Sequence, residues 1–297
     1  MPSWNKVLEA VQQQNSFDFL RKRYLSGLSK HTGRNTLIYY SAWLQKPGIA
    51  GDFSISDADK NGFMACMPPA KERTKGLDLI LHTPGGDVGA TESLIDYLRT
   101  LYGDDIRTIV PQLAMSGGTL LAFSGKEIVM GAHSSLGPVD PQFGGVAAQS
   151  YLYEFARACK EVAEHPERLP VWQMIIGKLQ PGFLTTCERA VEWSTEILET
   201  TLRQNMLKDL DAQKGLESIS RLFVDQQESK NHARHINRDK VRASGLKVID
   251  LESDAKLQEL VLSVHHLMCI TFQQTTSAKI IASNSGAAYI NHANPIQ

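Results

Sequence analysis

The chain has 297 residues, with 31 lysine and arginine side chains against 32 aspartates and glutamates, so its net charge is −1. This length fits one large domain or two small ones. Hydrophobic residues make up 42% of the chain and charged residues 21%, which excludes disorder by composition and allows a sizeable core. A balanced charge offers no electrostatic attraction to nucleic acid or to an anionic membrane, so neither partner is expected.

Cysteine and histidine spacing bears on the compartment and on metal binding. The four cysteines lie far apart without a C-x-x-C pair, which argues against a zinc site and a disulfide framework and fits a reducing compartment. The close histidine pairs, His232 with His235 and His265 with His266, lack a third clustered ligand. We therefore expect neither a metal nor another cofactor.

No segment is predicted to cross a membrane. The first residues contain no basic stretch followed by an apolar run, which a secretory signal would have. No run of about 18 apolar residues occurs either. The most apolar stretch, residues 257–272, contains Glu259 and two histidines and predicts a buried helix. These features predict a soluble, cytoplasmic protein.

The N-terminal part of the chain predicts helices followed by one strand. Residues 1–35 predict a helical arm, since apolar residues such as Val7 and Leu20 recur among many glutamine, lysine and arginine residues. Residues 36–43 form a short β-rich run bounded by polar residues, typical of a first strand. A turn-rich stretch follows, and a helix is expected to begin near Asp57.

The centre of the chain alternates between strand and helix patterns. Residues 77–82 are a nearly continuous apolar run, typical of a strand that is buried on both faces. Helical spacing follows over residues 90–101, then a strand over 106–111, a helix of small and apolar residues over 117–123, and a strand over 127–130. This alternation predicts parallel strands joined by right-handed crossovers, and hence an α/β fold.

The second half of the chain is mainly helical by pattern. Residues 150–204 predict helices with proline-flanked breaks at 165–170 and 180–182. A small βα unit begins at residue 244, and the last 20 residues, rich in serine, alanine and asparagine, are expected to be loosely ordered.

The sequence predicts three parts. They are a helical arm at residues 1–35, a main domain at residues 36–265 and a C-terminal segment at residues 266–297.

Two glycine-rich turns, Pro84–Gly86 and Ser116–Gly118, follow two predicted strands. The carboxyl ends of parallel strands are where open α/β sheets bind ligands. Glycines there let backbone N–H groups approach a substrate closely, and two such turns side by side can aim two donors at one oxygen, as an oxyanion hole does. Two ordinary tight turns remain the alternative.

Ser116 stands at a strand-to-helix junction, where a hydroxyl can be exposed on a rigid backbone. Its surroundings, Ala114–Gly118, approach the G-x-S-x-G nucleophile elbow but lack the first glycine. Neither a phosphate-binding P-loop nor an H-E-x-x-H metal motif is present.

Four blocks of the sequence, in this order and spacing, resemble the serine dehydrogenase proteinase family: His82–Val88, Ala114–Thr119, Glu127–Met130 and Leu136–Gln142. That family is related to signal peptide peptidase A and, more distantly, to the proteolytic subunit of Clp protease. The resemblance covers about residues 77–142. It implies a Clp/crotonase-like α/β fold, a spiral of ββα units with added helices. It also implies that Ser116 is the nucleophile and that the backbone N–H groups of Gly86 and Gly117 form the oxyanion hole.

The general base is not fixed by this resemblance. The histidine of the Clp subunit would fall near Pro138, so the chain departs from that triad. Relatives of signal peptide peptidase use a lysine on a later helical segment, which makes Lys178 the first candidate and Lys160 the second. His232 is a third candidate because the family carries a histidine there, although Ala233 stands where the family tends to have aspartate.

The function expected from the resemblance is that of a serine peptidase, which hydrolyses peptide bonds through an acyl-enzyme on Ser116 without a cofactor. Its substrate would be a peptide or protein, and the chain is expected to form a homo-oligomer. The alternative is a non-proteolytic crotonase-fold enzyme that binds acyl groups, or an inactive oligomeric scaffold. The glycines alone cannot separate the two, since the crotonase fold supplies an oxyanion hole without a nucleophilic serine.

Overall fold

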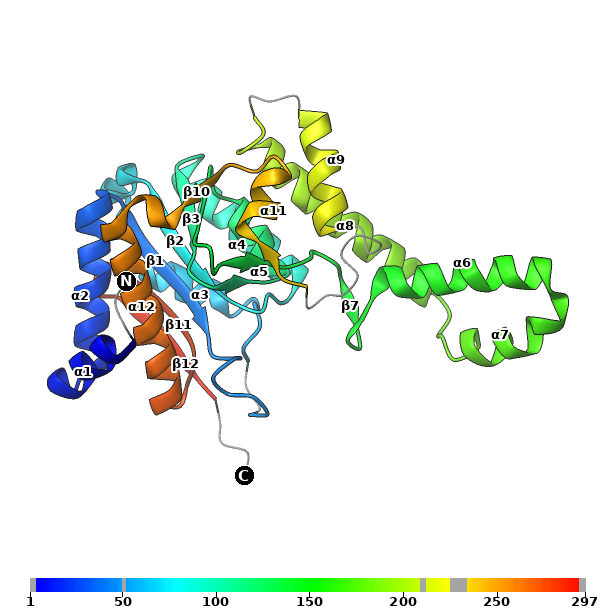
Figure 1. Ribbon diagram of the computed structural model, residues 1–297, viewed down its shortest axis with the longest axis horizontal. Helices are drawn as coiled ribbons and strands as arrows, with labels where there is room; N and C mark the ends of the chain where they lie inside the picture. The colour runs from blue at the N-terminus through cyan, green and yellow to red at the C-terminus, as the bar shows by residue number, and fades with distance from the viewer. Residues whose placement is uncertain (1–3, 50–51, 209–211, 225–233, 294–297) are drawn as a thin grey trace.

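The structure, a computed structural model, describes residues 4–49, 52–208, 212–224 and 234–293 (Figure 1). Its frame is a seven-stranded sheet in the order β10-β5-β3-β2-β1-β11-β12. The strands from β10 to β1 are parallel, and β11 and β12 are antiparallel to their neighbours. The bounds are β1 Asn35–Ser41, β2 Leu77–His82, β3 Ile106–Val110, β5 Ile128–Met130, β10 Val248–Asp250, β11 Ser277–Ser283 and β12 Ala288–His292.

The chain repeats one unit as it passes through the molecule. From β3 it continues into β4 (Leu113–Ala114) and then into helix α5 (Gly117–Phe123), and from β5 it continues into β6 (Ser135–Leu136). Strands β4 and β6, with β9 (Ile236–Asn237), form a second sheet of three strands. Strand β2 leads to a single bridge between Thr83 and Ala114, followed by helix α4 (Val88–Tyr102). These successive ββα units confirm the predicted α/β fold.

Helices cover both faces of the large sheet (Figure 1). On one face α1 (Trp4–Gln14), α2 (Phe17–Thr32) and α12 (Ala255–Gln274) pack together over the apolar side chains of one core cluster. On the other face α4, α5, α8 (Phe183–Arg203) and α9 (Ala212–Phe223) contribute to a second cluster. The buried helix predicted over residues 257–272 is confirmed as α12.

Local signals set the ends of the N-terminal helices. The side chain of Ser16 accepts a hydrogen bond from the N–H of Phe19 and caps α2, and Gly33 ends the same helix with a φ of 71°. The apolar stripe of the predicted helical arm, including Val7 and Leu20, is buried against the rest of the fold.

The C-terminal segment is better ordered than its composition predicts. Every residue of β11 is buried, and β11 and β12 extend the large sheet beyond β1. The expectation of loose order was therefore wrong for residues 278–293. The small and polar residues of Ser277–Ser283 fit here because β11 lies between two strands and below helices on both sides.

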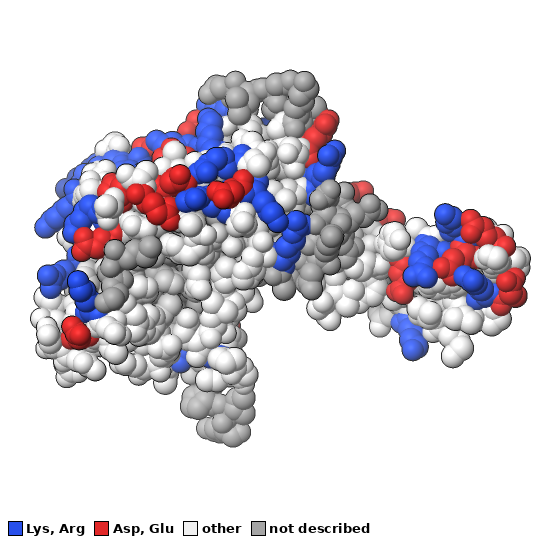
Figure 2. All heavy atoms as spheres, in the orientation of Figure 1, with Lys and Arg blue, Asp and Glu red and all other residues white. Residues whose placement is uncertain are grey.

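One part of the chain projects from the body. Helix α6 (Ala148–Glu164), the short helix η2 (Pro166–Arg168) and α7 (Leu169–Ile176) form a lobe that we call the projecting hairpin, residues 148–182 (Figures 1 and 2). The chain breaks where the prolines predict it. Helix α6 buries only Ala148 and Ala158. The large apolar side chains exposed on the hairpin are Tyr153, Phe155, Leu169, Val171, Met174 and Ile175.

The remaining elements connect these parts. They are α3 (Asp59–Cys66), η1 (Ala70–Lys75), β7 (Gln142–Phe143), β8 (Val146–Ala147), α11 (Arg238–Ala243) and η3 (Leu251–Ser253). Among the described residues, no helix has the length and apolar character needed to span a membrane.

Candidate active site

The two glycine-rich turns lie side by side at the carboxyl ends of β2 and β4. The N–H of Thr83 donates to the carbonyl of Leu113 at 3.2 Å, and the N–H of Met115 donates to the carbonyl of Thr83 at 3.0 Å. Because these bonds join the last residue before one turn to the last residue before the other, the turns run next to each other. The adjacency predicted from the sequence is therefore present.

Ser116 occupies a conformation that few residues other than glycine adopt. Its φ is 51° and its ψ is −119°, and helix α5 begins at the next residue. A backbone in such a region costs about 1–3 kcal/mol and persists only where its surroundings enforce it. One such constraint is Thr119, whose hydroxyl oxygen lies 2.9 Å from the carbonyl oxygens of both Ala114 and Gly137 and shares its one proton between them. The half-buried serine is thus held rigidly at the start of a helix.

The glycines of the two turns are required by close backbone approach. Gly85 has a φ of 92°, and a Cβ there would lie 2.5 Å from the carbonyl oxygen of Met115 and 2.7 Å from Cβ of Ser116. A Cβ on Gly86 would lie 2.2 Å from the backbone nitrogen of Ile55. A larger residue at Gly85 would therefore push the two turns apart, and one at Gly86 would displace the backbone of Ile55.

The amides of Gly86 and Gly117 lie close to each other. A Cβ built on Gly117 would be 3.4 Å from the backbone nitrogen of Gly86. Within the described part of the chain, neither N–H donates a hydrogen bond to a protein group. Two neighbouring, uncommitted donors beside a serine hydroxyl are able to stabilise a developing oxyanion.

These groups line one cavity of about 640 Å³. Ser116, Gly86 and Gly117 form part of its wall, and apolar side chains from distant segments form much of the rest. The lining residues are Ser54, Pro84, Gly85, Gly86, Asp87, Val88, Ser116, Gly117, Leu120, Val139, Asp140, Pro141, Gln142, Phe143, Ala190, Trp193 and Ser194. Its size is in the range of small-molecule and peptide-binding clefts.

The two acidic residues in the wall have structural contacts. Asp87 caps helix α4, because its side chain accepts a hydrogen bond from the N–H of Ala90 at 2.8 Å. Asp140 is buried, and its carboxylate accepts a hydrogen bond from the side-chain amide of Gln142 at 2.9 Å. Both carboxylates are therefore engaged in holding the wall of the cavity.

The candidate bases are not brought to Ser116 within the described chain. Lys178 and Lys160 are exposed on the projecting hairpin, and neither lines the cavity. His232 lies outside the described residues. The described lining holds no lysine or histidine, so the structure brings Ser116 close to the two amides but places neither Lys160 nor Lys178 beside them.

Sequence reasoning missed two contributions to the site. The segment of residues 52–56, which we call the strap, crosses the Gly85–Asp87 turn: the N–H of Ile55 donates to the carbonyl of Gly85, and the N–H of Asp87 donates to the carbonyl of Ile55. Trp193 on α8 forms part of the cavity wall. The only signal for the strap was an apolar residue, Ile55, inside a polar and turn-rich stretch.

Comparison with known proteins adds independent information. Residues 54–167 match the family of ClpP-like SDH-type serine proteinases. An uncharacterized protein of Methanocaldococcus jannaschii is 46% identical over 83 residues, which are 28% of this chain and 29% of the relative. A second uncharacterized protein of that organism is 40% identical over 88 residues, 30% of each chain.

The aligned segments therefore span less than a third of either relative. The matched segment of the family includes both glycine-rich turns, Ser116 and the wall residues up to Phe143. Over residues 54–167 the chain is similar to the ClpP-like SDH-type serine proteinases, which confirms the family resemblance predicted from its four sequence blocks.

Proposed function

We propose that this protein is a serine peptidase in which Ser116 attacks the carbonyl carbon of a peptide bond. The observation that carries the proposal is the placement of Ser116, held at a φ of 51° in the wall of a cavity beside two uncommitted backbone amides. The substrate is a peptide or protein. The cytoplasmic location expected from the sequence stays a prediction.

The first chemical step forms an acyl-enzyme. Oγ of Ser116 bonds to the carbonyl carbon, and the carbonyl oxygen takes the negative charge. The N–H groups of Gly86 and Gly117 donate to that oxygen, and such donors are each worth about 2.7–4 kcal/mol to the transition state. Collapse of this intermediate breaks the C–N bond, and the leaving nitrogen takes up the proton that the base removed from Ser116, so that an amine is released. Water then hydrolyses the ester and regenerates the serine.

A base has to remove the hydroxyl proton, and we propose Lys178, with Lys160 and His232 as the alternatives. Since Lys178 is exposed on the projecting hairpin and does not line the cavity, the hairpin of a second copy would supply it. In that position the amine of the lysine would accept the proton from the hydroxyl of Ser116.

Self-association is supported by the surface of the hairpin. Six large apolar side chains are exposed between Tyr153 and Ile175, and the hairpin begins next to the cavity wall at Phe143. In Figure 2 the stretch between the body and the tip of the hairpin is largely free of charged side chains. Apolar patches of this kind mark interaction sites. We therefore expect a homo-oligomer, and a sedimentation experiment that finds a monomer at micromolar concentration contradicts this.

A fluorophosphonate probe, which reacts with activated serines, tests the nucleophile. We expect the wild type to be labelled and the Ser116→Ala variant to be unlabelled, with the labelled residue located by peptide mass mapping. Labelling that persists in the variant contradicts the assignment of Ser116. No labelling of the wild type favours the alternative of a non-proteolytic acyl-binding enzyme or an inactive scaffold.

A mixing experiment tests whether the base comes from a second copy. Ser116→Ala and Lys178→Ala are each expected to be inactive alone. After the two variants are unfolded and refolded together, a shared site that takes Ser116 from one chain and Lys178 from the other should restore part of the activity. Mixing Ser116→Ala with Lys160→Ala in the same way tests the alternative base on the same hairpin. Full activity of Lys178→Ala alone contradicts the proposed base.

A further inference from the structure

A buried lysine lies on the C-terminal strand β11, far in sequence from the candidate site. The side chain of Lys279 is 1% exposed. Its Nζ contacts the carboxylate of Asp59, which is fully buried, at 2.7 Å, and the carboxylate of the half-exposed Asp52, also at 2.7 Å. Two carboxylates thus surround one ammonium group. A buried charge of this kind is retained only where its partners compensate the loss of hydration.

The lysine holds the strap directly. Its Nζ donates to the carbonyl of Ser54 at 2.9 Å and to the carboxylate of Asp52, so it binds two strap residues at once. The hydroxyl of Ser56 donates to the same carboxylate of Asp52 at 3.1 Å. The strap is therefore tied to β11 along its length rather than at one point.

Asp59 adds a second attachment from helix α3. Its Oδ2 accepts hydrogen bonds from the N–H of Ser56 and from the hydroxyl of Tyr39, both at 2.9 Å. Its Oδ1 faces Lys279. The carboxylate therefore connects the end of the strap to strand β1, which carries Tyr39, and to strand β11, which carries the lysine.

The strap in turn holds both amides of the proposed oxyanion hole. Ile55 bonds to the turn on both sides of Gly86, at 2.7 Å to the carbonyl of Gly85 and at 2.9 Å from the N–H of Asp87. Its side chain lies against Gly117, where its Cδ1 would be 3.5 Å from an added Cβ. One buried residue thus touches the two segments that carry the donors.

We infer that Lys279 is a positioning residue, which with Asp59 fixes the strap and through Ile55 sets the direction of the Gly86 and Gly117 amides. This inference rests on the proposed function, since the amides matter for catalysis only if they bind an oxyanion. Lys279 does not line the cavity, so the role that we infer for it involves no contact with the substrate. A displacement of a catalytic group by roughly 1 Å can lower the reaction rate about 100-fold.

The test uses a double variant that removes the charges of Lys279 and Asp59 while it retains the hydrogen bonds that residue 59 accepts from Ser56 and Tyr39. Lys279→Met combined with Asp59→Asn leaves no unpaired buried charge, and the asparagine oxygen can still accept from Ser56 and Tyr39. We expect the rate constant of fluorophosphonate labelling and kcat for a peptide to fall about 10- to 100-fold. KM is expected to stay within about threefold, because substrate binding uses the rest of the cavity.

Hydrogen exchange separates positioning from a general loss of stability. The amides of Ile55 and Asp87 carry the bonds between the strap and the turn, so their exchange is expected to become faster in the double variant. The matched control is Asp78→Asn, which removes a buried carboxylate from an ion pair at the opposite end of the sheet. It is expected to lower Tm while kcat and exchange at Ile55 and Asp87 stay at the wild-type values.

The outcomes distinguish this inference from the proposed function. Wild-type kcat and unchanged exchange in the double variant overturn the positioning role of Lys279. A fall of kcat equal to that of the control at matched stability does the same. If the wild type is not labelled at all, the proposed function fails and exchange alone decides: faster exchange at Ile55 and Asp87 supports the anchoring, and unchanged exchange overturns it.

Discussion

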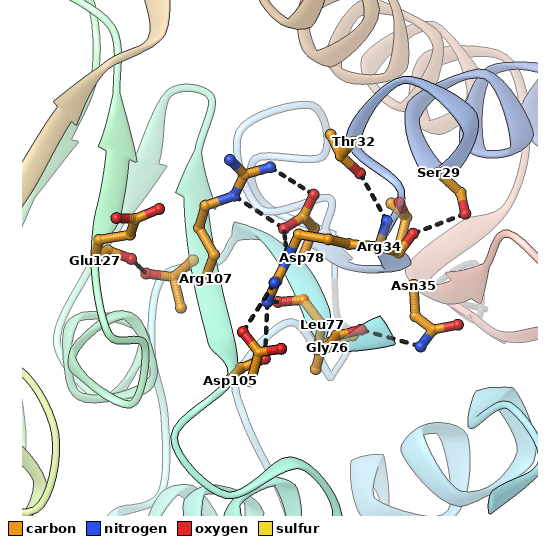
Figure 3. A network of polar contacts seen from close by, with 12 residues as sticks. Ser29, Thr32, Arg34, Asn35, Gly76, Leu77, Asp78, Asp105, Arg107 and Glu127 are labelled. Atoms are coloured by element: carbon orange, nitrogen blue, oxygen red, sulfur yellow. Dashed lines mark hydrogen bonds and ion pairs between the residues drawn. The ribbon is translucent and has the colours of Figure 1, made fainter. Parts of the chain in front are cut away.

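The polar groups at the two ends of the central sheet differ in whether they have hydrogen-bond partners. At the amino ends of β1, β2 and β3 the buried carboxylate of Asp78 accepts from Arg34 at 2.8 Å and from Arg107 at 2.7 and 2.9 Å (Figure 3). Arg34 continues to Asp105, which also accepts from Lys126. In Figure 3 the side chains of Arg34, Asp78, Asp105 and Arg107 form one continuous network across the strand ends.

At the carboxyl ends of the same strands, polar groups are left open or strained. Ser116 has a positive φ, and within the described chain the amides of Gly86 and Gly117 have no protein acceptor. His82, the last residue of β2, is fully buried with neither ring nitrogen hydrogen-bonded among the described residues. Burial lowers the pKa of this imidazole to about 3.

The difference indicates that the two ends of the sheet contribute differently to the protein. The amino ends contribute stability through a satisfied network of charges, and the carboxyl ends retain the open amides of Gly86 and Gly117 in the wall of a cavity. Sites that bind and react are drawn from such unsatisfied regions, because the groups that stabilise a transition state must be free in the resting protein. Changes at the two ends should therefore have opposite effects on stability and activity.

Replacement of the central carboxylate is expected to have the largest effect on stability. Asp78→Asn leaves Arg107 and part of Arg34 without a counter-ion in a buried site. The free energy of unfolding should fall by about 3 kcal/mol, the lower end for a broken buried pair. Urea unfolding measures this loss. The labelling rate per folded molecule should stay the same, and a parallel loss of labelling contradicts the separation of the two ends.

A methyl group in the turn that contains Gly86 should have the opposite consequence. In Gly86→Ala the added Cβ would lie 2.2 Å from the nitrogen of Ile55, so the turn or the strap must move. We expect the rate of fluorophosphonate labelling to fall by about 100-fold or more. The matched control is Gly215→Ala in helix α9, where among the described residues the Cβ meets Leu207 alone, at 3.5 Å. Equal rates for the two variants contradict the role of Gly86.

Much of this end of the molecule could be predicted from the sequence, because its signals are local. The run of apolar residues at 77–82 became β2, and the small apolar residues at 117–123 became α5, at the predicted bounds. The glycines identified the two turns because close backbone approach excludes a side chain. A periodic pattern or a required glycine is readable without knowledge of distant neighbours.

The features that could not be predicted depend on contacts between segments that are distant in the sequence. Lys279 is buried because Asp52, which is 227 residues away in the sequence, pairs with it. Without that partner, a lysine among serine and alanine residues indicates an exposed segment, and so the C-terminal strands were not predicted. Similarly, the helical pattern that contains Lys160 and Lys178 does not reveal whether the helices return to the site or project from the body.

The buried histidine predicts a dependence of stability on pH. The pKa of His82 is about 3 in the folded protein against about 6.5 in the unfolded chain. Below pH 6.5 the imidazole of His82 binds a proton in the unfolded chain but stays neutral in the folded protein. The free energy of unfolding therefore falls as the pH is lowered. Between pH 7 and pH 5 this group alone should cost about 2 kcal/mol. His265, whose pKa is also lowered by burial, acts in the same direction.

Urea unfolding at both pH values measures this loss, and the variant His82→Phe should remove about 2 kcal/mol of it. Phenylalanine keeps an aromatic ring against Trp43, whose ring centre lies 4.4 Å away. The control His165→Asn replaces an exposed imidazole on the projecting hairpin and shows what the loss of a surface histidine does in the same assay. An unchanged dependence in His82→Phe contradicts burial of a neutral imidazole at this end of the sheet.

Relief of the strain at Ser116 should have the smallest effect. Ser116→Ala removes the hydroxyl but keeps a Cβ at a φ of 51°, whereas Ser116→Gly removes both the hydroxyl and the unfavourable conformation. Both variants should be inactive. The glycine variant should be more stable than the alanine variant by about 1 kcal/mol, after the greater freedom of glycine in the unfolded chain is subtracted. In a chain of this length, a difference of about 1 kcal/mol shifts Tm by roughly 2 °C. Calorimetry measures this shift. Equal or reversed stability would show that Ser116 stores no strain, and the contrast between the two ends of the sheet would then rest on the open amides and His82 alone.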